Sequence, residues 1–307
     1  MKFKNANGFS IVEMIVVIAI IGVLAAIILP SLKSARMRAN KTQELALISH
    51  TGKAWVMYTG DHQGKLLPGY LSNEVQKYRK LAWAFPDESI VPPAPEYNSE
   101  ISNIAGPWPW RLLSYMNNDW NSLLFYKEVE WESNGGQLTQ HANEIATEPA
   151  FGYNGFYLGG WWEIDNHSSK PKMLFKSVTL TDGRVENVVA TFDSQIQKSS
   201  KQIVFCSTFF ANKGVYEEMQ NNTAGTYIAI PSVFARVVKW KPLGHNRIEA
   251  RFDTTIPLGR FNGMPAICNA DGSTMNVELE TLTDQSLWIS KAQKIDDIPA
   301  SKFSHTQ

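Results

Sequence analysis

A single glutamate, Glu13, interrupts an otherwise apolar stretch near the start of the chain. No other side chain between Phe9 and Leu32 carries a charge. An ionised carboxylate at membrane depth costs on the order of 2.5–3.5 kcal/mol on insertion scales. Such an acid persists where a cation neutralises it, and the stretch supplies none before Lys33. The sequence therefore predicts that another molecule, or a new amino terminus created nearby, provides the positive charge.

No arrangement of side chains elsewhere in the 307 residues indicates an active site. None of the six histidines belongs to an HExxH or comparable pair of metal ligands. Nucleophile elbows and phosphate-binding loops are also missing from the sequence. Lys and Arg balance Asp and Glu, so net charge gives no reason to expect nucleic acid as a partner. We therefore expect no catalytic residues, no enzyme activity and no cofactor.

Asp61, with His62 beside it and Gly64 after it, could begin a calcium-binding loop. The full DxDxDG spacing is missing. The favoured interpretation is an acid in a turn after a helix, and calcium binding is left open. Three further acids are interpreted as turn residues rather than metal ligands: Asp193, Asp253 and Asp271.

The two cysteines, Cys206 and Cys268, lie far apart in the sequence and form no CxxC motif. If the body folds outside the cytoplasm, they could form one disulfide between neighbouring strands. The alternative is a pair of unpaired thiols in the core.

Ten Trp, ten Tyr and fifteen Phe make the chain rich in aromatic residues. A large β-rich core is the favoured explanation, and a surface that binds sugars is the alternative. Four tryptophans could form an exposed platform for glycans, although core packing is favoured for them too. They are Trp108, Trp110, Trp161 and Trp162.

The stretch from Phe9 to Leu32 is long enough to cross a bilayer, because about 20 helical residues span the ~30 Å hydrocarbon layer. Lys2 and Lys4 precede it and should stay cytoplasmic, which places the rest of the chain outside. A cleaved secretory signal fits poorly, since the apolar run is too long and no small-x-small site closes it. A plain single-pass anchor explains the length but not Glu13.

The sequence GFSIVEMIVVIAIIGVLAAIILPSL closely resembles the type IV prepilin leader of pilins and type II secretion pseudopilins. A short basic leader ends in Gly, Phe follows, and Glu stands at the fifth position after the cleavage site. The resemblance implies that prepilin peptidase cuts between Gly8 and Phe9 and methylates the new Phe9 amine. It also implies that Glu13 pairs with a Phe9 ammonium in the growing filament, so assembly would neutralise an acid that is costly in lipid.

The resemblance also covers Gly22 and Pro30. In filaments of this family the helix often loosens between these two positions. Gly has a low helix propensity and Pro lacks a backbone donor. We therefore expect this segment to be the one that unwinds.

Beyond Leu32 the helix is predicted to continue as an amphipathic stalk to about Tyr58, giving a rod of about 70 Å. The segment TGDHQGKLLPG that follows is rich in helix breakers. An apolar stripe at 3-4-3 spacing should pack on the globular body. It consists of Leu45, Ile48, Gly52 and Trp55.

Four basic residues follow the membrane segment: Lys33, Arg36, Arg38 and Lys41. The favoured interpretation is a solvated basic collar. Contact with lipid phosphates, or with acids on a neighbouring subunit, is the alternative.

The rest of the chain is predicted to be loop-rich over residues 60–150 and β-rich from about residue 172. Four prolines in residues 85–100 exclude a long helix or central strand there. A short helix is expected at 109–117, and FGYNGFYLGGWW (151–162) should form strand and turn against the stalk. Two Asp-Gly pairs, at Asp182 and Asp271, predict β-hairpins. Further strands are expected within 201–208 and 227–240.

Several segments of the body are similar to a large prepilin-like family abundant in Planctomycetes, Verrucomicrobia and Lentisphaerae. They include YTGDHQGKLLPGY, FGYNGFYLGG, SSKQIVFCST and RFNGMPAICNADGSTMNV. The carboxy-terminal signature of that family is a His nine residues before an Asp-Gly. Here Phe261 stands in place of the His, which puts any role of that His in doubt. Five positions fit the signature: Arg260, Asn262, Gly263, Asp271 and Gly272.

Together these observations predict an α+β, pilin-like chain with a long amino-terminal helix packed on an antiparallel sheet with loop-rich insertions. The expected divisions are a leader (1–8), a transmembrane and assembly helix (9–32), an amphipathic stalk (33–58) and an extracytoplasmic body (59–307).

The resemblance implies a structural subunit of a type IV pilus-like or type II secretion pseudopilus filament. The alternative is a minor or tip subunit whose aromatic-rich body binds a glycan or a secreted protein. The implied partners are copies of the chain, other pilins or pseudopilins, prepilin peptidase, an inner-membrane assembly platform and, before assembly, membrane lipid. The implied location is the bacterial inner membrane with a periplasmic body, and then a filament in the periplasm or on the cell surface.

Overall fold

The computed structural model describes residues 10–78, 106–117, 119, 122–124, 144–179, 182–219, 223–234, 236–261, 263–292 and 305–306. The chain divides into two compact units, Met1–Gln43 and Glu44–Gln307. This boundary falls inside the predicted stalk, so the later half of the stalk belongs to the body. The predicted leader, its cleavage site and the proline-rich residues 85–100 lie outside the described residues.

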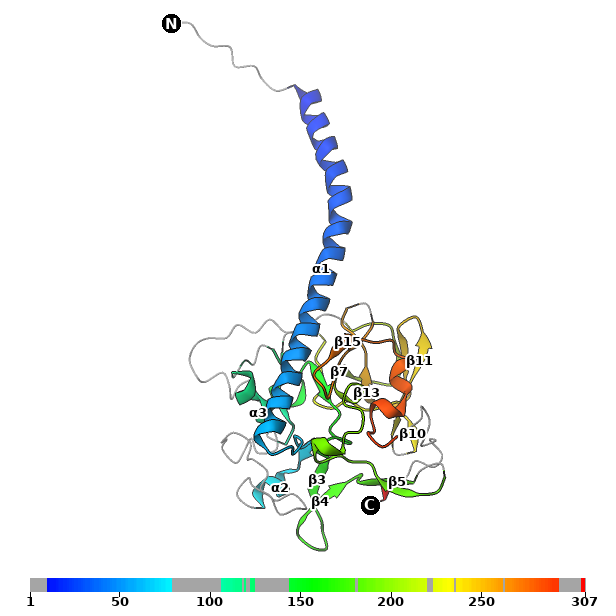
Figure 1. The fold of residues 1–307 in the computed structure, drawn as a ribbon. Helices are drawn as coiled ribbons and strands as arrows, with labels where there is room; N and C mark the ends of the chain where they lie inside the picture. The colour runs from blue at the N-terminus through cyan, green and yellow to red at the C-terminus, as the bar shows by residue number, and fades with distance from the viewer. Residues whose placement is uncertain are drawn as a thin grey trace. The chain divides into compact units, whose positions relative to one another are not determined.

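The first unit consists, in its described part, of the beginning of helix α1 (Ile11–Asp61), which Figure 1 shows as one continuous ribbon. The helix is unbroken at Gly22 and Pro30. Beside Pro30, which removes a backbone donor, the Ser31 hydroxyl donates to the carbonyl oxygen of Ile28 at 2.8 Å. The loosening expected between Gly22 and Pro30 concerns the filament, and it stays a prediction.

In the second unit, the last turns of α1 bury one face in the body. Ile48, Gly52 and Trp55 of the predicted stripe are buried and Leu45 is half-buried, so the stripe is confirmed. The Trp55 indole Nε1 donates to the Tyr153 hydroxyl oxygen at 3.3 Å. The contact confirms that the aromatic, glycine-rich segment packs on the stalk. The buried face of α1 consists of Glu44, Ile48, Thr51, Gly52, Ala54, Trp55, Tyr58 and Thr59.

The body is built around β7 (Ile203–Ala211), the longest strand in the described part of the chain. β2 (Phe151–Tyr153), β13 (Thr254–Pro257) and β14 (Ala266–Asn269) pair with it antiparallel, and β15 (Thr274–Asn276) pairs with β14. Eight of the nine β7 side chains are buried, as expected for a strand covered on both faces. The predicted α+β class, a long helix with a mostly antiparallel body, is confirmed.

Smaller elements surround this sheet. α3 (Pro109–Leu112) and η2 (Leu113–Met116) confirm the short helix expected at 109–117. β1 and β3 pair in parallel, whereas the other described strand pairs are antiparallel. The remaining elements are β1 (Tyr70–Leu71), α2 (Asn73–Lys77), β3 (Trp161–Ile164), β4 (Pro171–Leu174), β5 (Ser177–Thr179), β6 (Val185–Asn187), η3 (Asp193–Gln195), β8 (Gly214–Tyr216), β9 (Val233–Phe234), β10 (Val237–Val238), β11 (Trp240–Gly244), β12 (Arg247–Ala250), η4 (Thr281–Thr283), η5 (Gln285–Leu287) and β16 (His305–Thr306).

Both Asp-Gly pairs lie in β-hairpins, as predicted. Asp182 and Gly183 lie between β5 and β6, and Asp271 and Gly272 lie between β14 and β15. The two glycines have φ of 86° and 84°, values that favour glycine because it has no Cβ. Local turn chemistry therefore determines both hairpins.

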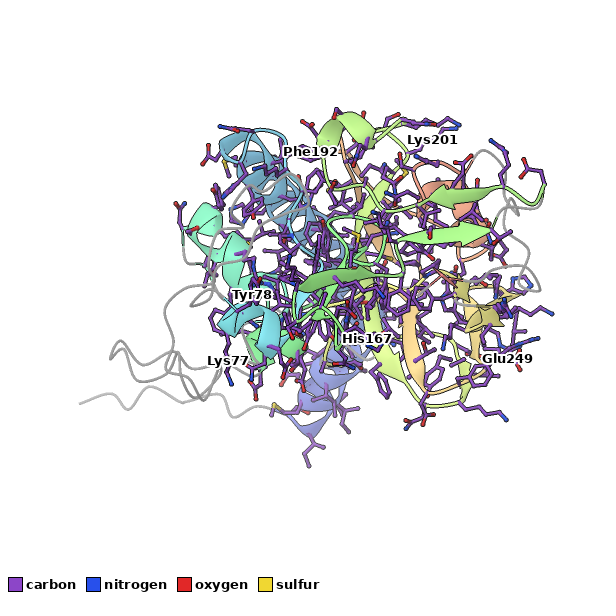
Figure 2. The ribbon with its side chains drawn as sticks, turned by 90° about the horizontal axis from the view of Figure 1, so that it is seen from below. Lys77, Tyr78, His167, Phe192, Lys201 and Glu249 are labelled. Carbon is purple, nitrogen blue, oxygen red and sulfur yellow. The ribbon has the colours of Figure 1, made fainter. Side chains whose placement is uncertain are left out.

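The possible disulfide between Cys206 and Cys268 is not present, and both thiols are free and buried. In the β7–β14 register, Cys206 lies opposite Ile267 and Cys268 lies opposite Phe205. Neighbouring residues of a strand point to opposite faces. Cys206 accordingly packs in the cluster with Trp240, whereas Cys268 packs in the other cluster with α1. The sheet itself separates the two sulfurs, and Figure 2 shows how densely side chains fill the body.

α1 lies close against the sheet at Gly52. A Cβ added there would lie 2.2 Å from the Cys268 sulfur. Gly60, on the same helix, has open space at the corresponding position. The absence of a side chain at Gly52 therefore sets the distance between helix and β14.

We predict that Gly52→Ala lowers the free energy of unfolding by about 1–3 kcal/mol through overpacking. The matched change Gly60→Ala should raise it by up to about 1 kcal/mol, because alanine favours helix. The measurement is denaturant unfolding of the detergent-solubilised chain. Removing the opposing sulfur with Cys268→Ala should rescue Gly52→Ala, and equal effects of the two glycine changes would refute the contact.

Candidate functional site

The start of α1 is a capping box formed by Ser10 and Glu13. The Ser10 hydroxyl oxygen accepts from the Val12 backbone N–H at 3.3 Å. The Glu13 carboxylate, in turn, accepts from the Ser10 backbone N–H at 2.8 Å. These bonds satisfy amide groups that have no partner within the helix. The S-x-x-E spacing before the apolar run is the sequence signal of a capping box, and it could have predicted this contact.

Glu13 is exposed, and the helix provides no cation for it. Its described partner is a neutral peptide N–H. The next basic residue along the helix is Lys33. Twenty residues of helix separate the two, which is about 30 Å. The capping bond therefore orients the carboxylate but leaves its charge uncompensated within residues 10–43.

The apolar half of α1 carries large hydrophobic side chains on all faces. Their exposed fractions range from 45% at Leu32 to 78% at Ile11. The most apolar part of the helix has a mean hydropathy of 3.1, and none of it is buried within the described residues. A helix that is apolar all round is stable only when lipid or protein covers it.

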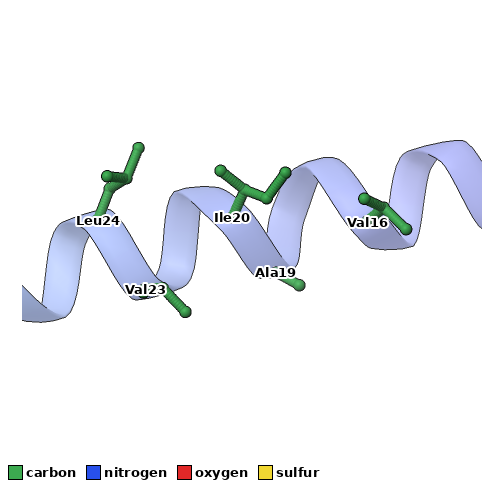
Figure 3. A pocket seen from close by; sticks show the side chains of 5 residues that line it. All are labelled: Val16, Ala19, Ile20, Val23 and Leu24. Atoms are coloured by element: carbon green, nitrogen blue, oxygen red, sulfur yellow. The ribbon is translucent and has the colours of Figure 1, made fainter.

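Five side chains in this half of α1 line a shallow apolar groove along one face of the helix. Figure 3 shows them as the residues Val16, Ala19, Ile20, Val23 and Leu24. The spacing i, i+3, i+4, i+7 and i+8 is that of a helix–helix contact surface. Ala19 is the smallest of the five, so another helix could approach closely there.

A second polar site lies inside the body, where Glu44 of α1 meets Arg260. Their side chains are 1% and 0% exposed, and Arg260 Nη1 lies 3.6 Å from Glu44 Oε1. The Ser207 hydroxyl donates to the same carboxylate oxygen at 2.9 Å. Arg260 also donates to the backbone oxygens of Ala150, at 3.1 Å, and Thr223, at 3.2 Å.

This ion pair ties α1 to three distant segments of the body. A buried charge is tolerated when it is paired and hydrogen-bonded. Removing one member leaves the other charge uncompensated. Arg260 was predicted as a signature position, whereas no role was predicted for Glu44. The Glu44–Arg260 pair therefore has a structural role, which is to hold the last turns of α1 to the body.

The other candidate residues do not form a common site. His62 Nδ1 lies 2.7 Å from the Tyr58 carbonyl oxygen, and the two rings stack. Asp61 is exposed; burial raises the pKa of Tyr115, and the negative charge and hydrogen bond of Asp61 raise it further. Within the described residues no group of three or more His, Cys, Asp or Glu side chains could hold a metal ion. Calcium binding at Asp61 stays untested.

The remaining acids serve turns. Asp253 accepts from the Lys213 backbone N–H at 2.9 Å. Asp271 accepts from the hydroxyl and backbone N–H of Ser273, which lowers the pKa of its carboxyl group. These bonds agree with the interpretation of both residues as turn acids.

The tryptophans belong to the core rather than to a platform. Trp108, Trp110 and Trp162 are 0%, 1% and 2% exposed. Trp161 is partly exposed, but its ring stacks on Tyr70 at 4.1 Å and on Phe156 at 5.1 Å. The four indoles therefore present no continuous open surface for a sugar ring.

Comparison with known proteins supports the amino-terminal segment. Residues 3–29 match the family model described as the prokaryotic N-terminal methylation motif. This segment is a prepilin motif. It contains Gly8, Phe9 and Glu13, so the resemblance of this segment to prepilins is confirmed.

In addition to the family model, a relative aligns over 71 residues with 41% identity: the type IV wide pilus major component PilA4 of Thermus thermophilus. The alignment covers 23% of this chain and 50% of that protein. The chain thus spans about half the length of the curated relative it matches. No solved structure matches. The similarity of the body to the family abundant in Planctomycetes stays a prediction.

We predict that Glu44→Leu lowers the free energy of unfolding by about 3–5 kcal/mol, because Arg260 remains buried without its carboxylate. Gln43→Leu, at the exposed neighbouring position, should change it by less than about 0.5 kcal/mol. Denaturant unfolding measures both.

The double variant Glu44→Leu/Arg260→Met completes the cycle. It should cost less than the sum of the two single changes, since the two side chains interact directly. Additive losses would mean that the pair makes no energetic connection between α1 and the body.

Proposed function

We propose that this chain is a structural subunit of a type IV pilus-like or type II secretion pseudopilus filament. The observation that carries the proposal is the combination of a prepilin motif with a helix that is apolar on all faces and buried on none. The alignment with a type IV pilus component supports the same assignment for the amino-terminal region. A subunit of this kind would exchange lipid for neighbouring helices as it assembles.

The Glu13 carboxylate would favour this exchange of lipid for neighbouring helices. Cleavage between Gly8 and Phe9 would create an amine that remains cationic after methylation. In the filament, that ammonium group would pair with the Glu13 carboxylate. An ion pair in a dry, low-dielectric bundle is much stronger than in water. Within the described residues this acid is bonded to the Ser10 peptide N–H, which is neutral, so pairing with a cation on assembly would lower the free energy of the subunit.

The apolar half of α1 fits an inner-membrane anchor. In the proposed arrangement Lys2 and Lys4 remain cytoplasmic and the body lies in the periplasm. Prepilin peptidase and an inner-membrane assembly platform would be the partners before polymerisation, and other pilins or pseudopilins would be the partners afterwards. A structural rather than an enzymatic role accords with this assignment.

The alternative function is a minor or tip subunit that binds a glycan or a secreted protein. Burial of Trp108, Trp110 and Trp162 removes the feature that favoured a glycan. Copy number separates the two functions, because a shaft subunit is present throughout a filament and a tip subunit is present a few times.

Processing is the first prediction of this proposal. Intact-mass analysis of the chain from its native cells should show loss of residues 1–8 and the addition of one methyl group. Gly8→Ala should accumulate the uncleaved precursor, because the peptidase would no longer recognise the site. An unprocessed wild-type amino terminus in cells with an active prepilin peptidase would refute the proposal.

The role of the Glu13 charge can be separated from its capping role. Glu13→Gln keeps an oxygen that can accept from the Ser10 N–H but removes the charge. We predict normal membrane insertion and at least tenfold less filament incorporation for both Glu13→Gln and Glu13→Ala, since tenfold corresponds to about 1.4 kcal/mol. The measurement is the amount of subunit in sheared filaments relative to membranes.

Ser10→Ala is the matched control, because it removes the hydroxyl cap and keeps the acid. It should polymerise within about fivefold of wild type, as a cap contributes only about 1 kcal/mol. Wild-type incorporation of Glu13→Gln would show that the carboxylate acts through helix capping and not through charge neutralisation.

A further inference from the structure

Four basic residues form a collar on α1 directly after its apolar half: Lys33, Arg36, Arg38 and Lys41. Lys33, Arg36 and Arg38 are exposed, and Lys41 is half-buried. None of the four forms an ion pair or side-chain hydrogen bond with any residue that the structure describes. This basic collar therefore carries four positive charges available to a partner outside the chain.

No acid close to the basic collar in the sequence offsets its charge. The sequence contains no Asp or Glu from Met14 to Gln43. The next acid, Glu44, is buried in the body, where it is engaged by Ser207 and Arg260. The local charge of this segment is therefore +4 by count of its side chains.

The positions around the helix indicate what kind of partner fits. At about 100° per residue, the four side chains point at about 0°, 300°, 140° and 80° in chain order. They spread over about 200°, twice the stripe of about 100° that one packed helix covers. A lipid surface surrounds a spanning helix on all sides, so a wide collar matches lipid better than one protein contact.

The place of the collar along the helix gives the same indication. Leu32 is the last residue of the apolar stretch, and Lys33 follows it directly. The Ser31 hydroxyl, just before the collar, is bonded back to the Ile28 carbonyl oxygen and so does not need water. The cations therefore begin where the hydrocarbon layer ends and the phosphate groups of the lipids lie.

We propose that the basic collar binds the phosphate groups of anionic phospholipids at the membrane surface next to Leu32. The two arginines can hold a phosphate by paired N–H donors, and the lysines add point charges. The interaction would fix the depth of α1 in the bilayer before assembly. It rests on α1 spanning a membrane, but not on cleavage, polymerisation or the side on which the body lies.

The test uses the full chain reconstituted in phosphatidylcholine bilayers at low salt. Spin-labelled phosphatidylglycerol or spin-labelled phosphatidylcholine then reports how strongly each lipid associates with the protein. We expect the protein to prefer phosphatidylglycerol over phosphatidylcholine by at least about fivefold. This factor corresponds to the attraction of roughly one Lys or Arg to an anionic lipid surface. In about 0.5 M salt the preference should fall toward one, because the charges are screened.

The quadruple variant Lys33→Gln/Arg36→Gln/Arg38→Gln/Lys41→Gln should lose the preference while keeping the helix, since glutamine has a similar helix propensity. A matched variant removes four exposed lysines of the body and should keep the preference. Its changes are Lys198→Gln, Lys201→Gln, Lys213→Gln and Lys241→Gln.

Three outcomes would overturn the proposal. The first is a preference that survives in the collar variant. The second is a preference that disappears only in Lys2→Gln/Lys4→Gln, which would place the lipid contact at the other end of the helix. The third is a collar variant that keeps the lipid preference but is incorporated poorly into filaments. That result would mean that the collar contacts acids of a neighbouring subunit. None of these outcomes alters the processing test, so the two proposals fail separately.

Discussion

The two parts of the continuous helix α1 lie in different environments, and the rest of the structure depends on this difference. The early part of α1 is apolar on every face, and no described residue buries it. The last turns of the same helix enter the core of the body, where the backbone at Gly52 lies against Cys268. The first part therefore requires a cover from outside the chain, whereas the chain itself covers the last turns.

The two carboxylates at opposite ends of this helix show how the chain treats each environment. Glu44 is fully buried, and the body supplies it with Arg260 and the Ser207 hydroxyl. Glu13 receives a peptide N–H from Ser10 and no cation in the described residues. Within the described residues, the chain provides a cation for Glu44 and none for Glu13. This contrast supports the view that the countercharge of Glu13 belongs to another subunit.

Local signals in the sequence predicted local structure well. Asp182-Gly183 and Asp271-Gly272 specified their hairpins because the turn residues themselves determine the backbone angles. The hairpin between β11 and β12 was not predicted, since it turns through Gly244, His245 and Asn246, all with positive φ, and residues other than glycine seldom adopt this conformation.

Features that depend on distant residues could not be predicted in the same way. Glu44 could not be identified as a buried acid, because its partner, Arg260, is far along the chain. The disulfide looked feasible because spacing does not reveal on which face of a sheet each cysteine lies. Burial of Trp108 and Trp162 agrees with the core packing that the aromatic-rich composition favoured. The stacking of Trp161 on Tyr70 and Phe156 depends on the fold and could not be predicted. The prepilin motif was the exception among functional features, because its residues are contiguous in sequence.

The carboxy-terminal signature gains a physical meaning from Arg260. This side chain is buried and binds the Ala150 and Thr223 carbonyl oxygens as well as the Glu44 carboxylate. Phe261, at the position where the predicted signature has His, is 6% exposed and packs as a core residue. The contacts of Arg260 therefore give this signature position a structural role in this chain. The Glu44–Arg260 pair is buried within the body, whereas three features proposed to interact with other molecules lie on the early part of α1. They are the Glu13 carboxylate, the apolar groove and the basic collar.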